Sequence, residues 1–347
     1  MNPSSVLVLG ATGFIGRHLV ADLLRDGQPV IALSRDPEKA RRVLGSAPQV
    51  VGSLTTLPAD SRISAVVNLT GSPVIGMPWT DARRHALVTS RTGPAAAALA
   101  LIRRLDEKPK TLVAASAVGF YGATPGASFE PRDESAPPRP GEFQSDLCVA
   151  VEKEALAAEA LGLRVVLARF AVVLGRDGGA YPMLTPAARL GLGATLGSGR
   201  QPAPWVHVDD VIGLLRLALA DNRLSGPLNV VAPTTPTNAE YTQALAASFG
   251  RKARLRLPAA PLRWLGGEMS SLLLDGQNAV PSRAIAAGYA FKFPTLAGAL
   301  ADLARGTPGR PACKQRGHRL TARRAAVLRT SSTAHRRMPA RASATLP

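Results

Sequence analysis

Short apolar runs alternate with longer amphipathic stretches along the N-terminal two thirds of the chain. Runs rich in Val, Leu, Ile and Ala predict buried strands, and apolar residues at helical spacing predict helices between them. The predicted strands are Val6–Leu9, Val30–Arg35, Gln49–Gly52, Ile63–Thr70, Lys110–Ala117, Arg164–Leu174 and Leu228–Val231. The predicted helices are Phe14–Leu24, Asp81–Arg104, Phe143–Leu161 and a fourth that Asp209 and Asp210 cap and that ends at Ala220. This alternation predicts an α/β fold with a parallel, doubly wound sheet.

Glycine and proline interrupt the alternation twice, from Gly122 to Gly141 and from Leu174 to Pro204. From Thr235 to Arg305 the predicted elements become shorter and richer in helix. We therefore expect a smaller, mostly helical C-terminal lobe over the carboxyl ends of the strands, where such folds bind substrates. The predicted domains are a nucleotide-binding domain (1–175, with 206–232 returning to it), a substrate lobe (176–205 and 233–305) and a tail (306–347).

The first strand joins the first helix through three glycines. Gly10 permits a tight turn, Gly13 lets the backbone approach a pyrophosphate, and Gly16 lets the helix pack close to the strand. The helix N-terminus adds N–H donors and a positive dipole end. The pattern GxxGxxG between a strand and an amphipathic helix indicates a Rossmann dinucleotide site of the short-chain dehydrogenase type. Its predicted cofactor-binding residues are Gly10, Thr12, Gly13, Phe14, Ile15 and Gly16.

The tip of the second strand predicts which dinucleotide binds. NAD enzymes place an acidic residue there on the ribose hydroxyls, whereas this chain has Ser34 and Arg35. A hydroxyl and a guanidinium can hydrogen-bond a 2′-phosphate with charge assistance. NADP(H) is therefore the predicted cofactor. The alternative is that Arg35 is a solvated loop residue and Asp36 binds the ribose.

The net charge of +18 is concentrated at the C-terminus. Residues 306–347 hold ten Lys or Arg and no acid, which leaves +8 on the first 305 residues. With Pro, Ser, Thr and Gly and little apolar periodicity, this stretch is predicted to be a disordered basic tail. No Phe, Trp or Tyr lies among its charges, so base stacking has no support and nucleic acid is not an expected partner.

The rest of the composition indicates a globular protein: 347 residues with 46% hydrophobic content can bury a full core. The two cysteines, Cys148 and Cys313, are too far apart for a metal-ligand spacing and form no disulfide framework. No apolar stretch is long enough to span a bilayer, and the first apolar run is too short for a signal helix. We expect a cytoplasmic location, no membrane partner and no metal.

Many ordered stretches make the chain similar to the atypical extended short-chain dehydrogenase/reductases, an epimerase-like family with a small C-terminal domain of uncharacterised function. The similarity covers about residues 5–304. The stretches that carry it are Gly10–Gly16, Ser34-Arg35, Asn68–Gly71, Trp79-Thr80, Ser90-Arg91, Ala115–Gly122, Val173–Gly175, Gly178-Gly179, Gly197–Gln201, Trp205–Asp210, Leu262–Met269 and Phe291–Pro294.

The resemblance implies an NADP(H)-binding, oxidoreductase-like or epimerase-like protein whose substrate is unassigned. It further implies that Leu69, Thr70 and Gly71 pass the adenosine and ribose of the cofactor, and that Ser90 and Arg91 face the cleft from the following helix. Two local alternatives remain: Thr70 as a strand-end hydroxyl that bonds its own backbone, and Arg91 as a salt-bridged helix residue.

The catalytic set departs from the usual pattern. Hydride transfer to a carbonyl needs a proton donor, and related enzymes use a Tyr with a Lys four residues later and a Ser that positions the oxygen. Ser116 fits the Ser position, but Val149 precedes Lys153 by four residues. The family's own Cys…Trp-Glu arrangement is matched by Cys148 and Glu152, with Val151 in place of Trp.

Substitutes for the missing Tyr-Lys pair are few. Tyr121 lies five residues after Ser116, and Glu152 can act as acid or base if burial raises its pKa. Ser116, Glu152 and Tyr121 are therefore the predicted catalytic residues. Arg169 is predicted at the cofactor, where it and Arg200 can also hold an acidic substrate. Gln201 and Trp205 are predicted to line the nicotinamide pocket, His207 is more typical of a packed structural residue, and Cys148 of the core.

The sequence thus predicts an NADP(H)-dependent oxidoreductase with an unusual acid/base set, acting on an unknown small molecule as a monomer or homodimer. The alternative is a protein that binds NADP(H) as a structural or redox-sensing ligand without turnover.

Overall fold

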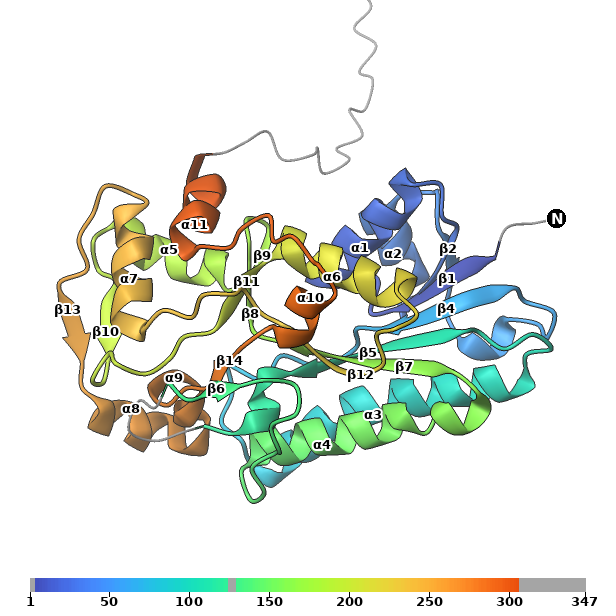
Figure 1. Ribbon diagram of the computed structural model, residues 1–347, viewed down its shortest axis with the longest axis horizontal. Helices are drawn as coiled ribbons and strands as arrows, with labels where there is room; N and C mark the ends of the chain where they lie inside the picture. The colour runs from blue at the N-terminus through green and yellow to red at the C-terminus, as the bar shows by residue number, and fades with distance from the viewer. Residues whose placement is uncertain (1–3, 124–128, 306–347) are drawn as a thin grey trace, which may run out of the picture. The chain divides into compact units, whose positions relative to one another are not determined.

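The central sheet of the protein has seven parallel strands in the order β12-β7-β5-β4-β1-β2-β3 (Figure 1). The coordinates are a computed structural model that describes residues 4–123 and 129–305. The strands are β1 Ser5–Leu9, β2 Val30–Leu33, β3 Gln49–Val51, β4 Ile63–Asn68, β5 Thr111–Ala117, β7 Arg164–Phe170 and β12 Gly226–Val230. Their order, with crossovers on both sides of β1, is that of a Rossmann fold. The predicted fold class is confirmed.

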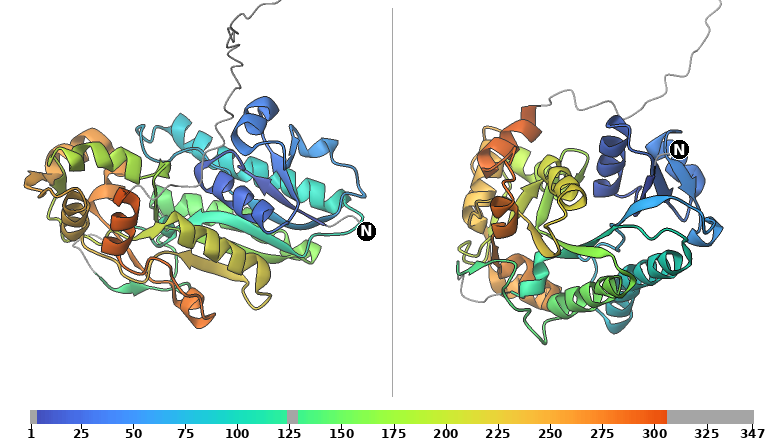
Figure 2. Two further views of the ribbon diagram at one scale, coloured as in Figure 1. Left: turned by 90° about the horizontal axis from the view of Figure 1, so that it is seen from above. Right: turned by 45° about the vertical axis from the view of Figure 1, so that its right-hand side comes forward.

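Helices cover both faces of this sheet (Figures 1 and 2). One face carries α1 Phe14–Arg25, α2 Pro37–Leu44 and α6 Val208–Ala220, and the other carries α3 Asp81–Arg104 and α4 Phe143–Leu156. Strand β1 shows why, because successive side chains of a strand point to opposite faces. Val6 and Val8 join the core formed with α1 and α6, whereas Leu7 and Leu9 join the core formed with α3 and α4.

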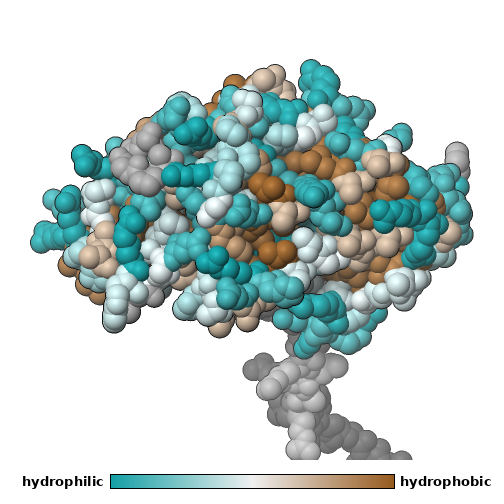
Figure 3. All heavy atoms as spheres, turned by 90° about the horizontal axis from the view of Figure 1, so that it is seen from below, coloured by the Kyte–Doolittle hydropathy of each residue, from teal (hydrophilic) through white to brown (hydrophobic). Residues whose placement is uncertain are grey.

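The outer surface of α3 and α4 is not uniformly charged. Ala96, Ala97 and Ala100 of α3 are exposed, and so is Val149 of α4. Seen from below, apolar residues lie between hydrophilic ones over this side of the molecule (Figure 3). The oligomeric state, monomer or homodimer, stays a prediction.

The other elements build small sheets and a second core. Strands β8 Val172–Gly175, β9 Gly178–Gly179 and β11 Trp205–His207 form one sheet, and two strand pairs follow: β10 Ala194–Leu196 with β13 Leu255–Leu257, and β6 Pro131–Arg132 with β14 Asn278–Ala279. The helices are α5 Tyr181–Arg189, α7 Asn238–Ala247, α8 Ala259–Gly266, α9 Ser271–Leu274, α10 Ser282–Ala286 and α11 Leu296–Arg305. Single 3-10 turns are η1 Leu54–Thr56, η2 Val118–Tyr121, η3 Glu159–Leu161 and η4 Gly267–Ser270. Trp205, Tyr241 and Leu300 anchor the second core.

The strand predicted over Arg164–Leu174 is two strands in different sheets. Strand β7 ends at Phe170, and β8 begins at Val172 and pairs with β11. Between them, the Ala171 amide donates to Val230 and the Val172 amide donates to Pro204. The prediction was wrong because the apolar run is continuous, and a run of buried residues does not reveal a change of partner strand.

Helix predictions were wrong at several points, and α2 was not predicted at all. The helix from Phe143 ends at Leu156, and its last predicted turn is the separate 3-10 turn η3. Helix α5 was missed because the segment up to Pro204 is rich in glycine; Pro182 lies in the first turn of this helix, where a missing N–H costs nothing. The cap of α6 is His207, whose Nδ1 accepts from the Asp209 amide at 3.1 Å.

Among the described residues, no helix is long and apolar enough to cross a membrane. The predicted basic tail, residues 306–347, lies outside the described residues, as does Cys313. The division of residues 1–305 into a nucleotide-binding domain and a substrate lobe stays a prediction.

Candidate functional site

The loop from β1 to α1 packs so tightly that it requires glycine. Gly10 has φ +76°, and a Cβ there would lie 2.7 Å from the Leu69 carbonyl oxygen. A Cβ on Gly16 would lie 2.2 Å from the Gly10 carbonyl oxygen. Both obstacles are backbone atoms, so neither residue can be larger without moving the loop. The loop therefore brings the start of α1 directly over the ends of β1 and β4.

The N-terminus of α1 carries amide groups without partners. Gly13 caps the helix without a side chain, and no acidic residue lies in the first turn. The first helical hydrogen bond runs from the Arg17 amide to the Gly13 carbonyl oxygen, so the amides of residues 14–16 have no acceptor among the described residues. Unpaired N–H groups at the positive end of a helix dipole form an anion site, which fits the pyrophosphate of a dinucleotide.

Thr12 and Phe14, two predicted cofactor-binding residues of this loop, lie in different surroundings. The Thr12 side chain is half-buried and its hydroxyl has no partner in the described part of the chain. The Phe14 ring packs on the glycines of the β8–β9 hairpin, and a Cβ on Gly175 or Gly178 would lie 2.3 Å from it. Phe14 can thus offer its amide to a ligand, while its ring holds the hairpin against α1.

At the tip of β2, the acidic residue is already in use. Asp36 caps α2, accepting from the Lys39 amide at 2.9 Å. The Ser34 hydroxyl bonds the Asp36 carbonyl oxygen at 3.0 Å. Arg35 is exposed, and its guanidinium has no hydrogen-bond or ion-pair partner among the described residues. An unpaired cation therefore stands at the tip of β2, and the choice between Arg35 and Asp36 as the residue at the ribose stays a prediction.

Beyond β4, side chains hold the strand tip in place. Both the amide and the hydroxyl of Thr70 donate to Asn68 Oδ1, at 3.1 and 2.6 Å, so Thr70 bonds a side chain rather than its own backbone. The Ser90 hydroxyl accepts from the Ser72 amide at 3.1 Å. Arg91 packs over Gly71 and donates to the Ser72 carbonyl oxygen at 2.9 Å. Ser90 and Arg91 thus fix the segment after β4 from helix α3.

Arg91 makes no ion pair in the described part of the chain, because its guanidinium donates to the carbonyl oxygens of Ser72 and Leu87. Burial lowers its pKa. The salt-bridged alternative for this residue therefore has no support.

The end of β5 meets helix α4 at Ser116 and Glu152. The Ser116 hydroxyl lies 2.7 Å from Glu152 Oε1, and Arg169 of β7 donates to both carboxylate oxygens at 2.8 Å each. A carboxylate held by a bidentate guanidinium accepts hydrogen bonds, so Ser116 is the donor in this pair. Its lone pairs remain free for a ligand, and the side chain is half-buried.

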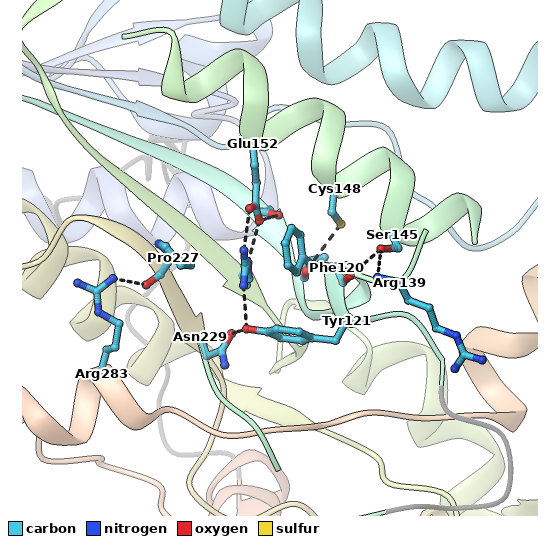
Figure 4. Close-up of polar contacts among 12 residues, drawn as sticks. Phe120, Tyr121, Arg139, Ser145, Cys148, Glu152, Pro227, Asn229 and Arg283 are labelled. Atoms are coloured by element: carbon cyan, nitrogen blue, oxygen red, sulfur yellow. Dashed lines mark hydrogen bonds and ion pairs between the residues drawn. The ribbon is translucent and has the colours of Figure 1, made fainter. Parts of the chain in front are cut away.

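Tyr121 joins this group through a hydrogen bond from Arg169. Figure 4 shows the Tyr121 hydroxyl beside Asn229. Its hydroxyl donates to Asn229 Oδ1 at 2.7 Å and accepts from Arg169 Nη1 at 3.0 Å. The residue is 4% exposed, and burial raises its pKa. The guanidinium also lies 3.5 Å from the centre of the Phe120 ring. The structure therefore brings the three predicted catalytic residues, Ser116, Glu152 and Tyr121, into one hydrogen-bond network. The Tyr121 hydroxyl, however, donates its hydrogen bond within that network, to Asn229, and not towards a substrate.

Three N–H groups of Arg169 donate to Glu152 and Tyr121, and the residue is only 3% exposed. Because it is buried, its guanidinium lies away from the surface that a cofactor could contact. We interpret Arg169 as a positioning residue that orients Glu152, rather than as a cofactor ligand.

Sequence analysis missed two buried polar residues of this region. Asn229 of β12 has no exposed surface, and its amide group donates to the Val280 and Arg132 carbonyl oxygens. Gln144 of α4 packs against Gly119, and its Oε1 is buried without a partner among the described residues. Asn229 reads as an ordinary strand residue and Gln144 as an ordinary helix residue. Only the fold places them beside Tyr121 and η2.

The remaining candidates lie apart from the network or inside the core. Cys148 is buried, and burial raises the pKa of its thiol to about 11. Lys153 is exposed on α4. Trp205 is 1% exposed in the second core, so the prediction that it lines a nicotinamide pocket was wrong. Gln201 is also buried, with its amide donating to the Leu196 and Leu273 carbonyl oxygens. In the described part of the chain, no cluster of His, Cys, Asp or Glu suits a metal ion.

The Rossmann sheet, the glycine loop and the free N-terminus of α1 define a dinucleotide-binding protein of the extended short-chain dehydrogenase/reductase class. The sequence profile of the NAD dependent epimerase/dehydratase family matches residues 6–231, and a domain of unknown function (DUF1731) matches residues 257–303. The chain belongs to the NAD dependent epimerase/dehydratase family. The family resemblance predicted from the sequence is confirmed.

Individual relatives agree along nearly their whole length. Epimerase family protein YfhF of Bacillus subtilis is 34% identical over 308 residues, covering 86% of this chain and 97% of YfhF. Human epimerase family protein SDR39U1 is 36% identical over 303 residues, covering 86% and 99%. A crystal structure of human SDR39U1 (isoform 2) with NADPH has a TM-score of 0.78 at 34% identity, covering 87% of this chain and 99% of that one.

Proposed function

We propose that the protein binds NADP(H) and transfers a hydride to or from an unassigned small molecule. The free guanidinium of Arg35 at the tip of β2 carries the cofactor choice, since Asp36 is used as a helix cap. The cation can bind a 2′-phosphate, and the unpaired amides of α1 can bind the pyrophosphate. The structure of the similar human protein with NADPH supports this choice.

The proposed chemistry lies at the end of β5. When bound, NADPH would supply a hydride to a carbonyl substrate, and NADP+ would accept one from the corresponding alcohol. The Ser116 hydroxyl donates its hydrogen bond to Glu152, so its oxygen can accept a hydrogen bond from a substrate hydroxyl and orient that group. Glu152, Arg169 and Tyr121 act behind it as positioning residues, because their polar atoms are used among themselves. The site therefore favours a substrate that presents a hydroxyl, in the alcohol form of an alcohol–carbonyl pair.

The surroundings of Tyr121 and Lys153 favour a second function, in which NADP(H) is bound without turnover. The buried Tyr121 hydroxyl donates to Asn229, and Lys153 is exposed on α4. Among the described residues, no Tyr-Lys pair therefore stands ready to protonate a product. In this alternative, the protein binds NADP(H) as a structural or redox-sensing ligand and does not turn over.

Label transfer distinguishes the two functions. The purified protein is incubated with a cell metabolite extract and NADPH deuterated stereospecifically on one face of the nicotinamide, and the products are analysed by mass spectrometry. The enzyme function predicts deuterium in one or a few metabolites, from one face only, and about a hundredfold slower labelling with the Ser116→Ala variant. Tight NADPH binding without label transfer from either face supports the sensor alternative.

A further inference from the structure

Strand β13 and helix α8 follow one another in the chain and bury almost nothing. All three residues of β13 are exposed, and none of the described side chains of α8 is buried. Leu255 and Leu257 are 46% and 44% exposed, and Trp264 is 84% exposed. In Figure 1, β13 lies at the left margin, outside α7 and β10, and leads into α8. Large apolar side chains gathered on adjacent exposed elements mark an interaction surface.

The neighbouring chain segment extends this surface. Strand β10 pairs with β13, and the Arg251 side chain donates to the Arg189 carbonyl oxygen at 3.2 Å. Residues 190–196 therefore run beside residues 251–257. Leu190 and Leu192 are 72% and 55% exposed. We call the combined set the basic apolar surface: Leu190, Leu192, Lys252, Arg254, Leu255, Arg256, Leu257 and Trp264.

The cations of this surface are free. Lys252, Arg254 and Arg256 are exposed and have no hydrogen-bond or ion-pair partner among the described residues. The sequence contains no Asp or Glu from Tyr241 to Gly267. Because successive side chains of a strand point to opposite faces, Leu255 and Leu257 project from one face of β13 and the unpaired Arg256 from the other. Both faces are exposed, and the chain continues to the exposed Trp264. An occupant must be anionic and must also accept apolar side chains.

We propose that the basic apolar surface binds the surface of an anionic phospholipid bilayer. Lipid headgroups supply phosphate and carboxylate for the cations, and the boundary with the acyl chains accepts leucine and tryptophan. A nucleic acid would match the cations but give the leucines no contact, since it binds through phosphates and base stacking. The chain's own residues 306–347 are excluded by charge, because they carry ten cations and no acid.

This proposal departs from the expectation that the protein has no membrane partner. That expectation rested on the lack of a membrane-spanning segment, and a surface contact needs none. The proposal is independent of the cofactor site, which is formed by other elements. It can therefore be tested on protein that retains NADPH binding.

The tryptophans provide a direct readout in the full-length chain. The chain has three of them, and Trp79 and Trp205 are 8% and 1% exposed, whereas Trp264 is 84% exposed. Vesicles of phosphatidylserine and phosphatidylcholine, or of phosphatidylcholine alone, are added at 0.1 M salt. With the anionic vesicles we expect a blue shift of the emission and quenching by lipids brominated near the headgroup. The Trp264→Phe variant should still sediment with vesicles but lose most of the quenching.

A charge variant and a matched control separate this surface from other cations. Each cation near an anionic bilayer contributes about fivefold to the partition coefficient. Arg254→Glu/Arg256→Glu should therefore weaken vesicle partitioning at least about 25-fold. Arg103→Glu/Lys110→Glu makes the same change of charge at two exposed, unpaired residues on other elements and should change partitioning much less. An apolar variant, Leu257→Ser/Trp264→Ser, should weaken partitioning at unchanged net charge. Melting curves and NADPH titration confirm that each variant is folded.

Three results would overturn the proposal. Equal binding to anionic and neutral vesicles would remove the role of charge. An equal loss of vesicle partitioning in the two charge variants would show that the net charge of the protein drives binding, and residues 306–347 carry most of that charge. Anionic binding without quenching of Trp264 would show that another surface faces the bilayer.

Discussion

Arg169 on β7 donates through Nε and Nη2 to the two carboxylate oxygens of Glu152 on α4, at 2.8 Å each, and the two side chains are 4% and 6% exposed. Breaking a buried pair leaves an uncompensated charge, whereas an exposed pair contributes little. Arg169→Met should therefore lower the free energy of unfolding by about 3–5 kcal/mol. Urea unfolding followed by circular dichroism measures it.

The exposed pair of Arg41 and Glu38 on α2 is the control for this measurement. Arg41→Met should change the free energy of unfolding by less than about 1 kcal/mol. The double variant Glu152→Leu/Arg169→Met should cost less than the sum of its single variants, because neither charge remains unpaired. Similar costs for Arg169→Met and Arg41→Met would show that the buried pair does not hold the end of β5.

Sequence patterns predicted the features that depend on residues close together in the chain. The glycine loop is read within seven residues, from Gly10 to Gly16, because a tight turn and a close helix have requirements that nearby residues reveal. Helix α3 was predicted with the bounds that the structure shows, Asp81–Arg104, and it ends at two basic residues, as helices commonly do.

What could not be predicted depends on residues far apart in the chain. Tyr121 and Asn229 are separated by 108 positions and share a buried hydrogen bond. Ser116 and Glu152 were both selected from the sequence, but their contact, and the direction of its proton, follow from Arg169. Burial and pairing decide whether a polar side chain faces a ligand, and no sequence pattern reports them directly.

The glycine loop predicts different effects for two Gly→Ala changes. Gly16→Ala would place a methyl group 2.2 Å from the Gly10 carbonyl oxygen, so the loop must move. We expect a loss of about 1–3 kcal/mol of stability together with a loss of NADPH affinity. Gly27→Ala is the control, since Gly27 has φ +74° with nothing within 4 Å. It should cost about 1–2 kcal/mol for the left-handed backbone and leave affinity unchanged. Isothermal titration with NADPH measures the affinity of both variants. Unchanged NADPH affinity in Gly16→Ala would show that this loop does not bind the cofactor.

Arg35 predicts the preference between NADPH and NADH. Losing a charge-assisted hydrogen bond to phosphate costs about 1.5–3 kcal/mol, so Arg35→Ala should weaken NADPH binding by roughly tenfold to 150-fold and leave NADH binding nearly unchanged. Cofactor fluorescence titration measures both. Arg42→Ala on α2, also exposed and unpaired, controls for general charge. If Asp36→Ala weakens NADH binding instead, the acidic residue binds the ribose after all.

Cys148 predicts a loss of stability in alkaline solution. Burial raises the pKa of its thiol from 9.0 to about 11. The native state therefore holds the proton more tightly than the unfolded state, so the contribution is complete below pH 9 and is lost as the pH rises to 11. The loss approaches about 3 kcal/mol. In a Cys313→Ser background, Cys148→Ala should show a flatter decline of unfolding free energy between pH 8.5 and 10.5, the assay range. Rapid reaction of the native thiol with iodoacetamide at pH 8 would contradict its burial.

Ser116 predicts how turnover responds to substitution on α4 and β5. Its hydroxyl is half-buried at the end of β5, donates to Glu152 and keeps its lone pairs free for a substrate hydroxyl, whereas Lys153 is exposed on α4. Removing a positioned hydrogen-bonding group typically costs a hundredfold or more in rate, about 2.7–4 kcal/mol of transition-state stabilisation. With any substrate found by label transfer, Ser116→Ala should reduce kcat by that factor with NADPH affinity nearly unchanged, and Lys153→Met should leave kcat within a fewfold. The opposite ranking of the two variants would place the reacting oxygen away from β5 and give Lys153 the familiar role.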